Sequence, residues 1–322
     1  MNHYRRRLSD HLIRQYLFPL LLSLACALPL AASVSAQEIS SRAAVVMDAA
    51  TGRVLFAKNP ELRLMPASTT KLMTALVVLD HAALSDIVTV SRRASAAPAT
   101  KIGLKGGEAV EVLTLLNAAL IKSANDAAVA LAEAVAGSED NFAGLMNNKA
   151  LALGLQNTRF VNSNGLPGPG QYITALDLAV IMREALHYPL LTEILGTRVT
   201  EVPSGNGKTK IMRNTNHLLW SDEALLVGKT GYTRQAGHCF VSAADRQCGT
   251  IIVALLGSSS RAVLWKETED LLDFGARVLN NLEESVVYVT KSDYDAAMLK
   301  KASLTGKGKT RKSRTKKKRN VL

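Results

Sequence analysis

One lysine inside an apolar helical segment constrains this chain more than any other feature. The apolar residues between Pro66 and Asp80 recur at helical spacing, which predicts a buried helix that Pro66 and Ser68 would begin and cap. Lys71 follows Ser68 by three residues, so the amine and the hydroxyl share a helix face. Burial favours the neutral amine, which can take a serine's proton. The alternative is a capping serine followed by a lysine that extends to water.

The pattern in the rest of the chain predicts a sheet built from both ends of the sequence. Strands are expected at 43–48, 53–57, 87–90, 227–232, 238–244 and 249–256, and an edge strand at 286–289. Helices are expected at 112–122, 126–136, 141–153, 175–186 and 265–279. We therefore expect an α/β (α+β) fold, in which helices flank an antiparallel sheet and an all-helical lobe is inserted at about 91–200.

The first 36 residues have the pattern of an export signal. Arg5, Arg6, Arg7 and Arg14 precede an apolar run at 17–32, and small residues at 34–36 offer a cleavage site. An uncleaved N-terminal anchor is the alternative. We expect an exported protein that acts in the periplasm or elsewhere in the cell envelope, outside the cytoplasmic membrane.

The basic character of the chain is concentrated at its C-terminal end. Residues 300–322 carry eleven Lys or Arg and no acidic residue, and residues 1–36 carry a net +3. Subtracting +11 and +3 from the formal net charge of +12 leaves −2 for residues 37–299. We expect a disordered tail that binds an anionic wall polymer or a membrane surface, with a merely solvated tail as the alternative. Export argues against a nucleic-acid partner.

Three short motifs follow one another in the expected elements. Ser68-x-x-Lys71 opens a helix, Ser123-x-Asn125 lies at a helix junction, and Lys229-Thr230-Gly231 lies on a strand. Each motif is weak alone, but the set in this order is typical of penicillin-binding proteins and class A β-lactamases. Segments 65–74, 153–162 and 228–233 agree as well. On these residues the chain resembles the D-alanyl-D-alanine carboxypeptidase family of low-molecular-weight penicillin-binding proteins, over roughly residues 40–279.

The resemblance implies a β-lactamase/transpeptidase-like fold and a serine peptidase. The enzyme would remove the terminal D-alanine from peptidoglycan stem pentapeptides, and β-lactams would inhibit it covalently. Its catalytic residues would be Ser68 as nucleophile, Lys71 as general base and Ser123 as proton relay. Substrate would be bound by Asn125, Lys229, Thr230, Gly231 and Tyr232, whose backbone N–H would form an oxyanion hole with that of Ser68. The resemblance implies no cofactor and no metal.

Two features depart from the family pattern. Many relatives continue into a β-rich domain and an amphipathic anchor, whereas fewer than fifty residues follow Leu279. Relatives often place an arginine eleven residues before the glycine matched by Gly275, where this chain has Leu264. We expect Arg261 to take that substrate-binding role. The expected domains are a signal peptide (1–36), a catalytic domain (37–285) and a C-terminal extension (286–322).

Other functions have less support in the sequence. A DD-endopeptidase that cuts peptide cross-links would use the same residues, and the stretch 213–218 resembles such enzymes. A wall-binding module with an inert body would not need Ser68, Lys71 and Lys229. A β-lactamase would need an E-x-x-L-N motif, which residues 137–175 lack. The stretches 207–209 and 228–230 both read G-K-T, but each lacks the glycine that a P-loop has five positions earlier. The sequence has no spacing typical of a metal site. Cys239 and Cys248 are not expected to form a disulfide.

Overall fold

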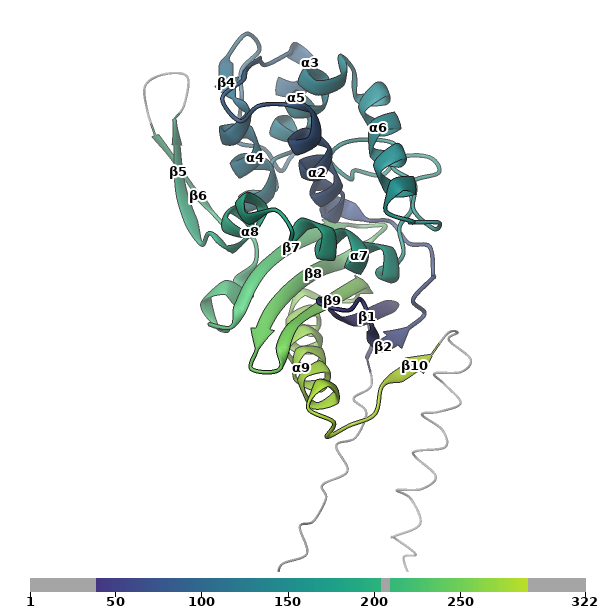
Figure 1. The fold of residues 1–322 in the computed structure, drawn as a ribbon. Coiled ribbons are helices and arrows are strands. Elements are labelled where there is room, and N and C mark those ends of the chain that lie inside the picture. Colours follow the sequence, from purple (N-terminus) through teal and green to yellow (C-terminus); the bar gives the residue numbers. More distant parts are fainter. Residues whose placement is uncertain (1–38, 204–208, 289–322) are drawn as a thin grey trace, which may run out of the picture. The chain divides into compact units, whose positions relative to one another are not determined.

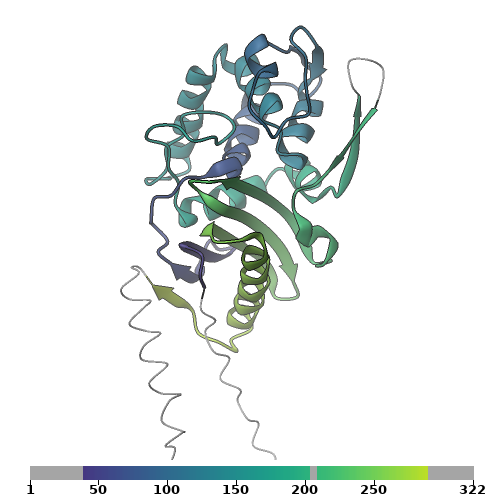
Figure 2. The ribbon, with the colours of Figure 1, turned by 180° about the vertical axis from the view of Figure 1, so that it is seen from behind.

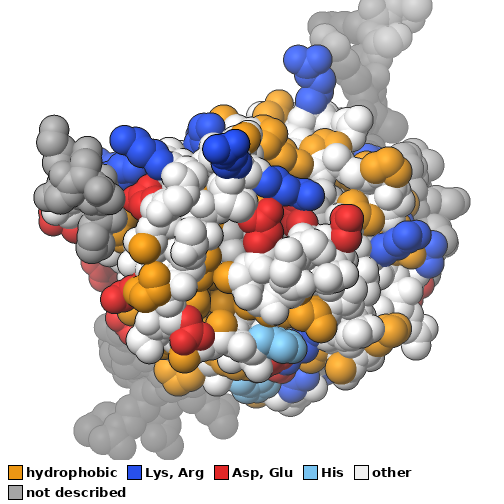
Figure 3. Space-filling view, turned by 90° about the horizontal axis from the view of Figure 1, so that it is seen from above, with side chains coloured by type: hydrophobic (Ala, Val, Ile, Leu, Met, Phe, Trp, Pro, Cys, Tyr) orange, Lys and Arg blue, Asp and Glu red, His pale blue; other side chains and the backbone are white. Residues whose placement is uncertain are grey.

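The computed structural model describes residues 39–203 and 209–288. The expected signal peptide and basic tail lie outside the described residues, as do the last residue of the expected edge strand and most of the C-terminal extension. Among the described residues, no helix combines the length and the apolar character needed to cross a membrane. Basic and acidic side chains are interspersed on the face shown in Figure 3, as the nearly neutral charge of this region suggests.

A central sheet of six strands joins both ends of the described chain (Figure 1). Its order is β10-β2-β1-β9-β8-β7. The bounds are β1 (Ala43–Asp48), β2 (Val54–Lys58), β7 (Leu225–Thr233), β8 (Gly237–Arg246), β9 (Gly249–Ser258) and β10 (Val286–Tyr288). All neighbours are antiparallel except β10 and β2, which run parallel. β9 is central and is buried over residues 251–256, as its continuous aliphatic run predicted.

Helices cover both faces of this sheet (Figures 1 and 2). α9 (Arg261–Leu279) packs on one face and α7 (Ala175–Ala185) on the other. Gly275 permits the close approach of α9, because a Cβ there would lie 2.9 Å from side-chain atoms of both Val46 and Ile251. Ser260 caps α9 by accepting a hydrogen bond from the Val263 backbone N–H.

The inserted region surrounds α2, which is the central helix of the molecule. α2 spans Lys71–His81, and the helices of the inserted region are α3 (Arg92–Ser95), α4 (Val112–Ile121), α5 (Asn125–Ala136), α6 (Glu139–Ala152), α7 and α8 (Pro189–Gly196). Every residue from Lys71 to Val78 is buried, and α2 contacts α4, α5, α6 and α7. Burial on all sides of this helix therefore explains the apolar residues around Lys71.

The predicted α/β architecture is confirmed, with additions that the sequence pattern did not indicate. Short strands pair as β3 (Ile87–Thr89) with β4 (Ala109–Glu111), and β5 (Val199–Pro203) with β6 (Thr209–Arg213). β4, β5, β6, α3 and α8 were not predicted, because short segments carry too few residues to show a period. The inserted region is therefore mainly, not entirely, helical. Cys239 and Cys248 are free thiols.

Candidate active site

Ser68 lies in a tight turn that leads into α2. We expected its side chain to cap the helix, which was wrong. Residues Ala67–Thr70 form the 3-10 turn η1, and Pro66 occupies the cap position without a side-chain hydrogen bond. The Ser68 hydroxyl instead lies 3.0 Å from the Lys71 amine, as the three-residue spacing predicted. Ala67 has a positive φ of 49°, a conformation that costs a non-glycine residue about 1–2 kcal/mol.

Two fixed acceptors orient the Lys71 amine. Its Nζ donates to Asn125 Oδ1 at 2.7 Å and to the Asn164 carbonyl at 2.7 Å. The Asn125 amide is itself oriented, because its Nδ2 donates to the carbonyls of Pro98 and Ala99. A neutral amine has two N–H bonds and one lone pair. Since both acceptors must receive a proton, the lone pair of a neutral Lys71 is left to face the Ser68 hydroxyl.

Burial favours that neutral form. Lys71 has no exposed surface, and its desolvation lowers the pKa well below the ordinary value of a lysine. The positive charge of Lys229 lowers the pKa further, while the carboxylates of Asp126 and Glu139 oppose the shift. Desolvation likewise lowers the pKa of the fully buried Lys229 to about 7. Burial therefore favours the neutral form of both amines, and Lys229 changes its protonation state near pH 7.

The two carboxylates also hold the loops around Lys71. Glu139 accepts hydrogen bonds from the backbone N–H and hydroxyl of Ser163, the residue before Asn164. Asp126 accepts from the backbone N–H groups of Gly103 and Leu104. Our sequence reasoning missed Glu139, Asp126 and the Asn164 carbonyl. Acidic residues on helices are common, and a backbone carbonyl leaves no sequence signal, so only the folded chain reveals these roles.

A hydrogen bond at Ser123 connects the second motif to the third. The Ser123 hydroxyl accepts it from Lys229 Nζ at 2.9 Å, although 106 residues separate the two. Ser123 has a φ of 62°, in the left-handed region that non-glycine residues avoid, and it lies directly between α4 and α5. Such strained positions cluster at functional sites. No described hydrogen bond links Ser123 to Lys71, so the two serine–lysine pairs are separate.

Strand β7 places the third motif against the Ser68 turn. β7 is the last strand of the central sheet, so one of its edges has no partner strand among the described residues. A Cβ at Gly231 would lie 2.9 Å from the Ser68 backbone nitrogen, so only glycine permits this approach. Tyr232 follows, and its largely exposed ring lies tilted against that of His238, with the centroids 4.4 Å apart. The backbone N–H groups of Ser68 and Tyr232 are thus carried by adjacent segments.

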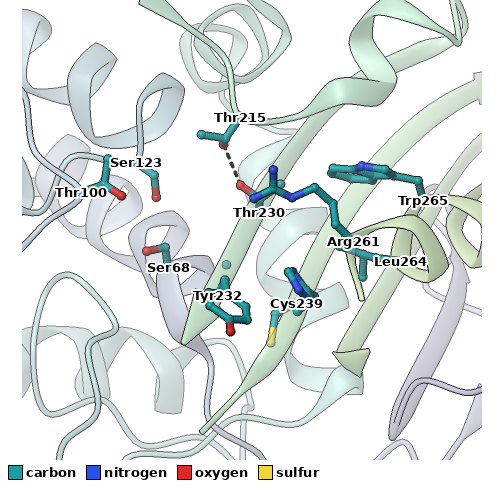
Figure 4. A pocket seen from close by; sticks show the side chains of 12 residues that line it. Ser68, Thr100, Ser123, Thr215, Thr230, Tyr232, Cys239, Arg261, Leu264 and Trp265 are labelled. Atoms are coloured by element: carbon teal, nitrogen blue, oxygen red, sulfur yellow. Dashed lines mark hydrogen bonds between the residues drawn. The ribbon is translucent and has the colours of Figure 1, made fainter. Parts of the chain in front are cut away.

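A cavity of about 210 Å³ lies between these segments. Ser68 and Ser123 line one side, and Thr230, Thr215 and Arg261 line another (Figure 4). The hydroxyls of Thr215 and Thr230 lie 2.6 Å apart. Figure 4 shows Arg261 extending from the start of α9 toward both threonines. Leu264, which stands where relatives often have an arginine, is buried and also lines the cavity. Its side chain carries no charge, whereas the nearby Arg261 places a guanidinium at the same cavity.

Most of the candidate residues line this cavity, but Lys71, Lys229 and Asn125 do not. The two lysines contact it through the hydroxyls of Ser68 and Ser123, whereas Asn125 has no such contact. It is buried, it does not line the cavity, and both ends of its amide are used within the protein. In this structure Asn125 therefore orients Lys71. The expected contact of Asn125 with substrate stays a prediction. Thr215, Thr100 and His238 line the cavity and were not predicted.

Comparison with known proteins identifies the family to which this geometry belongs. The family model described as D-alanyl-D-alanine carboxypeptidase matches residues 30–260. The chain belongs to this family. Among its relatives, the D-alanyl-D-alanine carboxypeptidase DacC of Escherichia coli is 38% identical over 258 residues, covering 76% of this chain and 63% of that protein. The predicted family is confirmed.

Proteins named for other activities are also similar. A D-alanyl-D-alanine endopeptidase of Pseudomonas aeruginosa is 37% identical over 212 residues, covering 64% of this chain and 67% of that protein. A mutant of the Streptomyces K15 DD-transpeptidase superposes with a TM-score of 0.71 at 30% identity, covering 74% of this chain and 99% of that one. This likeness confirms the transpeptidase-like fold. The chain spans about three fifths of the length of the first curated relatives that it matches.

Proposed function

We propose that this family member is a serine-type D-Ala-D-Ala carboxypeptidase that removes the terminal D-alanine from peptidoglycan stem pentapeptides. The hydrogen-bond arrangement at Lys71 is the observation that carries the proposal. Asn125 and the Asn164 carbonyl use both N–H bonds of the neutral amine, so its lone pair faces Ser68 at 3.0 Å. A lysine held in this way can act as a general base.

The reaction follows from the positions of these groups. Ser68 Oγ gives its proton to Lys71 and attacks the carbonyl of the penultimate residue, forming a C–O bond. Backbone N–H groups of Ser68 and Tyr232 stabilise the oxyanion. The C–N bond then breaks, and the leaving amine takes a proton through Ser123 and Lys229, which are hydrogen-bonded. Water then attacks the ester and gives a proton to the Ser123–Lys229 pair, which replaces the proton that the amine took. Lys71 returns its proton to Ser68 Oγ as the bond between this oxygen and the acyl carbon breaks, which restores the Ser68 hydroxyl.

Substrate is proposed to bind along the outer edge of β7. An extended peptide can pair with an exposed strand edge, which would bring its carbonyl to Ser68. The terminal carboxylate would bind Thr230 and Arg261, with added positive potential from Lys229 when it is protonated. Strained cyclic amides such as β-lactams would acylate Ser68 in the same way and act as covalent inhibitors.

Two further expectations remain part of this proposal. The pattern at 1–36 supports export to the periplasm or the envelope outside the cytoplasmic membrane. The basic residues at 300–322 support binding to anionic wall polymer or to phospholipid headgroups, at about 1 kcal/mol per basic residue near a surface. The catalytic domain is proposed to comprise residues 37–285.

Mass spectrometry of products tests the proposal directly. The protein is incubated with a stem pentapeptide and separately with a cross-linked peptide dimer, and Ser68→Ala serves as the control. Release of one D-alanine from the pentapeptide, lost in Ser68→Ala, is the expected result. Cleavage of the dimer alone would indicate the endopeptidase. If neither substrate reacts and penicillin forms no adduct on Ser68, the proposal is wrong.

A further inference from the structure

An ion pair at the surface of the inserted region is connected to the lysine that the reaction uses as a base. Arg93, on α3, binds Glu139 at the start of α6, with its Nη2 3.0 Å from Glu139 Oε2. The Arg93 side chain is 60% exposed, whereas that of Glu139 is 9% exposed. Glu139 therefore lies between a guanidinium in contact with water and the interior of the molecule.

The two carboxylate oxygens of Glu139 face different groups. Oε2 binds Arg93, while Oε1 accepts hydrogen bonds from the backbone N–H of Ser163 at 3.1 Å and from its hydroxyl at 2.7 Å. Asn164 follows Ser163 directly, and its carbonyl accepts the hydrogen bond of 2.7 Å from Lys71 Nζ. A continuous path of contacts thus leads from Arg93 through Glu139 and this loop to Lys71.

Contacts around α3 fix the position of Arg93. Ser91 caps α3 by accepting a hydrogen bond of 2.9 Å from the Ala94 backbone N–H, and its hydroxyl donates to Glu133 of α5 at 2.5 Å. Glu133 Oε1 lies 3.9 Å from Arg93 Nε, so a second carboxylate attracts the same guanidinium. The guanidinium is therefore held between α5 and α6.

Charges on three elements act on the Lys71 amine. Burial lowers its pKa most, and the positive charge of Lys229 on β7 lowers it further. Asp126 on α5 and Glu139 on α6 raise this pKa, because a nearby carboxylate stabilises the protonated amine. A positive charge bound to a carboxylate offsets the field of that carboxylate. Loss of Arg93 would therefore strengthen the effect of Glu139 and favour the protonated amine.

We propose that Arg93 is a positioning residue for the reaction at Ser68, and that it acts on Lys71 through Glu139. This inference rests on the proposed function, in which Lys71 takes the Ser68 proton. Arg93 does not line the cavity, so its effect does not require contact with substrate. Arg93 offsets the charge of Glu139 at Oε2 and leaves Oε1 to hold the loop that carries the Asn164 carbonyl. The alternative is an ion pair that only holds α3 against α6, and exposed pairs of that kind add little to stability.

The pH dependence of acylation by penicillin separates these two roles. In Arg93→Ala, the acid limb of the acylation rate constant is expected to move to higher pH by about 0.3 to 1 unit, because Lys71 stays protonated to higher pH. Acylation should be about two- to tenfold slower on that limb and should approach the native rate at higher pH. Arg93→Lys keeps the charge and should follow the native profile. An unchanged profile in Arg93→Ala, or an equal loss at every pH, would overturn the proposal.

A double-mutant cycle tests whether the effect passes through Glu139. Glu139→Gln removes the negative charge but keeps an oxygen that can accept hydrogen bonds from Ser163, so its acid limb should move to lower pH than in the native protein. Arg93→Ala should then cause little further shift in the Glu139→Gln background, because the charge that Arg93 offsets is gone. A shift of equal size in both backgrounds would overturn the proposal.

The neighbouring arginine on α3 provides a matched control. Arg92 is exposed and has no ion-pair partner among the described residues. Arg92→Ala removes the same charge from the same helix and should leave the pH profile unchanged. An equal shift in Arg92→Ala would indicate a general effect of surface charge and would overturn the role of Arg93. If penicillin did not acylate the native protein and no D-alanine were released, the proposed function itself would be disproved.

Discussion

At the scale of single residues, the chemistry of the site depends on a lysine that cannot reach water. Lys71 has a hydroxyl and two amide oxygens as neighbours, and none of these carries a charge. The nearest compensation comes from Asp126 and Glu139, which raise the pKa but do not overcome desolvation. A lysine is suited to this position because its charge can be lost on burial, whereas an arginine stays charged.

Lys71→Arg is therefore expected to slow acylation strongly, because it places a permanent charge where burial favours a neutral amine. A guanidinium cannot accept the Ser68 proton, so the acylation rate constant for penicillin should fall by about 10²- to 10⁴-fold. Lys149→Arg is the matched control, because Lys149 pairs with Asp80 at 3.0 Å and has a raised pKa. Retention of more than a tenth of the rate in Lys71→Arg would contradict the role of Lys71 as the base.

The pKa of Lys229 predicts how carboxylate binding depends on pH. Burial lowers this pKa to about 7, so the amine is charged below that pH and neutral above it. KM for a peptide with a free C-terminal carboxylate should therefore rise as the pH increases through about 7. A peptide with an amidated C-terminus should lack this rise. Profiles of KM against pH for the two peptides check the prediction, and parallel profiles would contradict it.

At the scale of elements, one loop places the carbonyl that orients Lys71. The loop at 162–165 lies against the Ser68 turn, and Thr74 of α2 donates to the Ser163 carbonyl at 2.6 Å. Gly165 has a φ of +82°, and a Cβ there would lie 1.8 Å from the Ala67 carbonyl oxygen. This contact fixes the distance between the loop and the nucleophile, because nothing larger than glycine fits.

Gly165→Ala should thus affect both stability and acylation. Gly154 provides the control, since its φ is +75° and a methyl group added there would meet no atom within 4 Å. Gly154→Ala should cost only the left-handed strain, about 1–2 kcal/mol, and leave the penicillin acylation rate unchanged. Gly165→Ala should cost more in urea unfolding and also slow acylation. Equal effects of the two variants would show that the contact with Ala67 is unimportant.

At the scale of the whole molecule, the site forms where the edge of the central sheet meets the inserted helical region. Segments near residues 68, 123, 164, 230 and 261 all contribute, so no continuous stretch of the chain contains the site. Any change that separates β7 from the Ser68 turn would move Lys229 and the proposed oxyanion hole away from Ser68. The fold and the chemistry are therefore coupled.

Deletion of residues 300–322 tests whether the basic tail recruits the enzyme to its substrate. Loss of eleven positive charges should weaken binding to isolated cell envelopes, most clearly at low ionic strength, where screening is least. Turnover of a soluble pentapeptide should not change, because the described site contains no tail residue. Sedimentation with envelopes measures the binding. Equal binding by the full and shortened chains at low salt would contradict recruitment.

Much of this organisation could be predicted from local pattern. The three motifs occupy the expected elements, and the positions of β1, β2, β8, β9 and α9 follow from hydrophobic periodicity. The pairing of Ser68 with Lys71 follows from helical spacing alone. Short elements such as α8 and the β5–β6 pair could not be predicted, because their stability comes from contacts with the rest of the fold.

The amino-acid sequence by itself predicted the candidate nucleophile and its base, and it determined the order of the motifs and the family, because these depend on residue identity and on spacing within one element. Only the tertiary structure decided that Asn125 orients Lys71, that Glu139 holds the Asn164 loop, and that Arg261 lies at the Thr230 end of the cavity. Those contacts join residues between 24 and 54 positions apart in the sequence. Their geometry depends on how the sheet and the helices pack, which local periodicity does not encode.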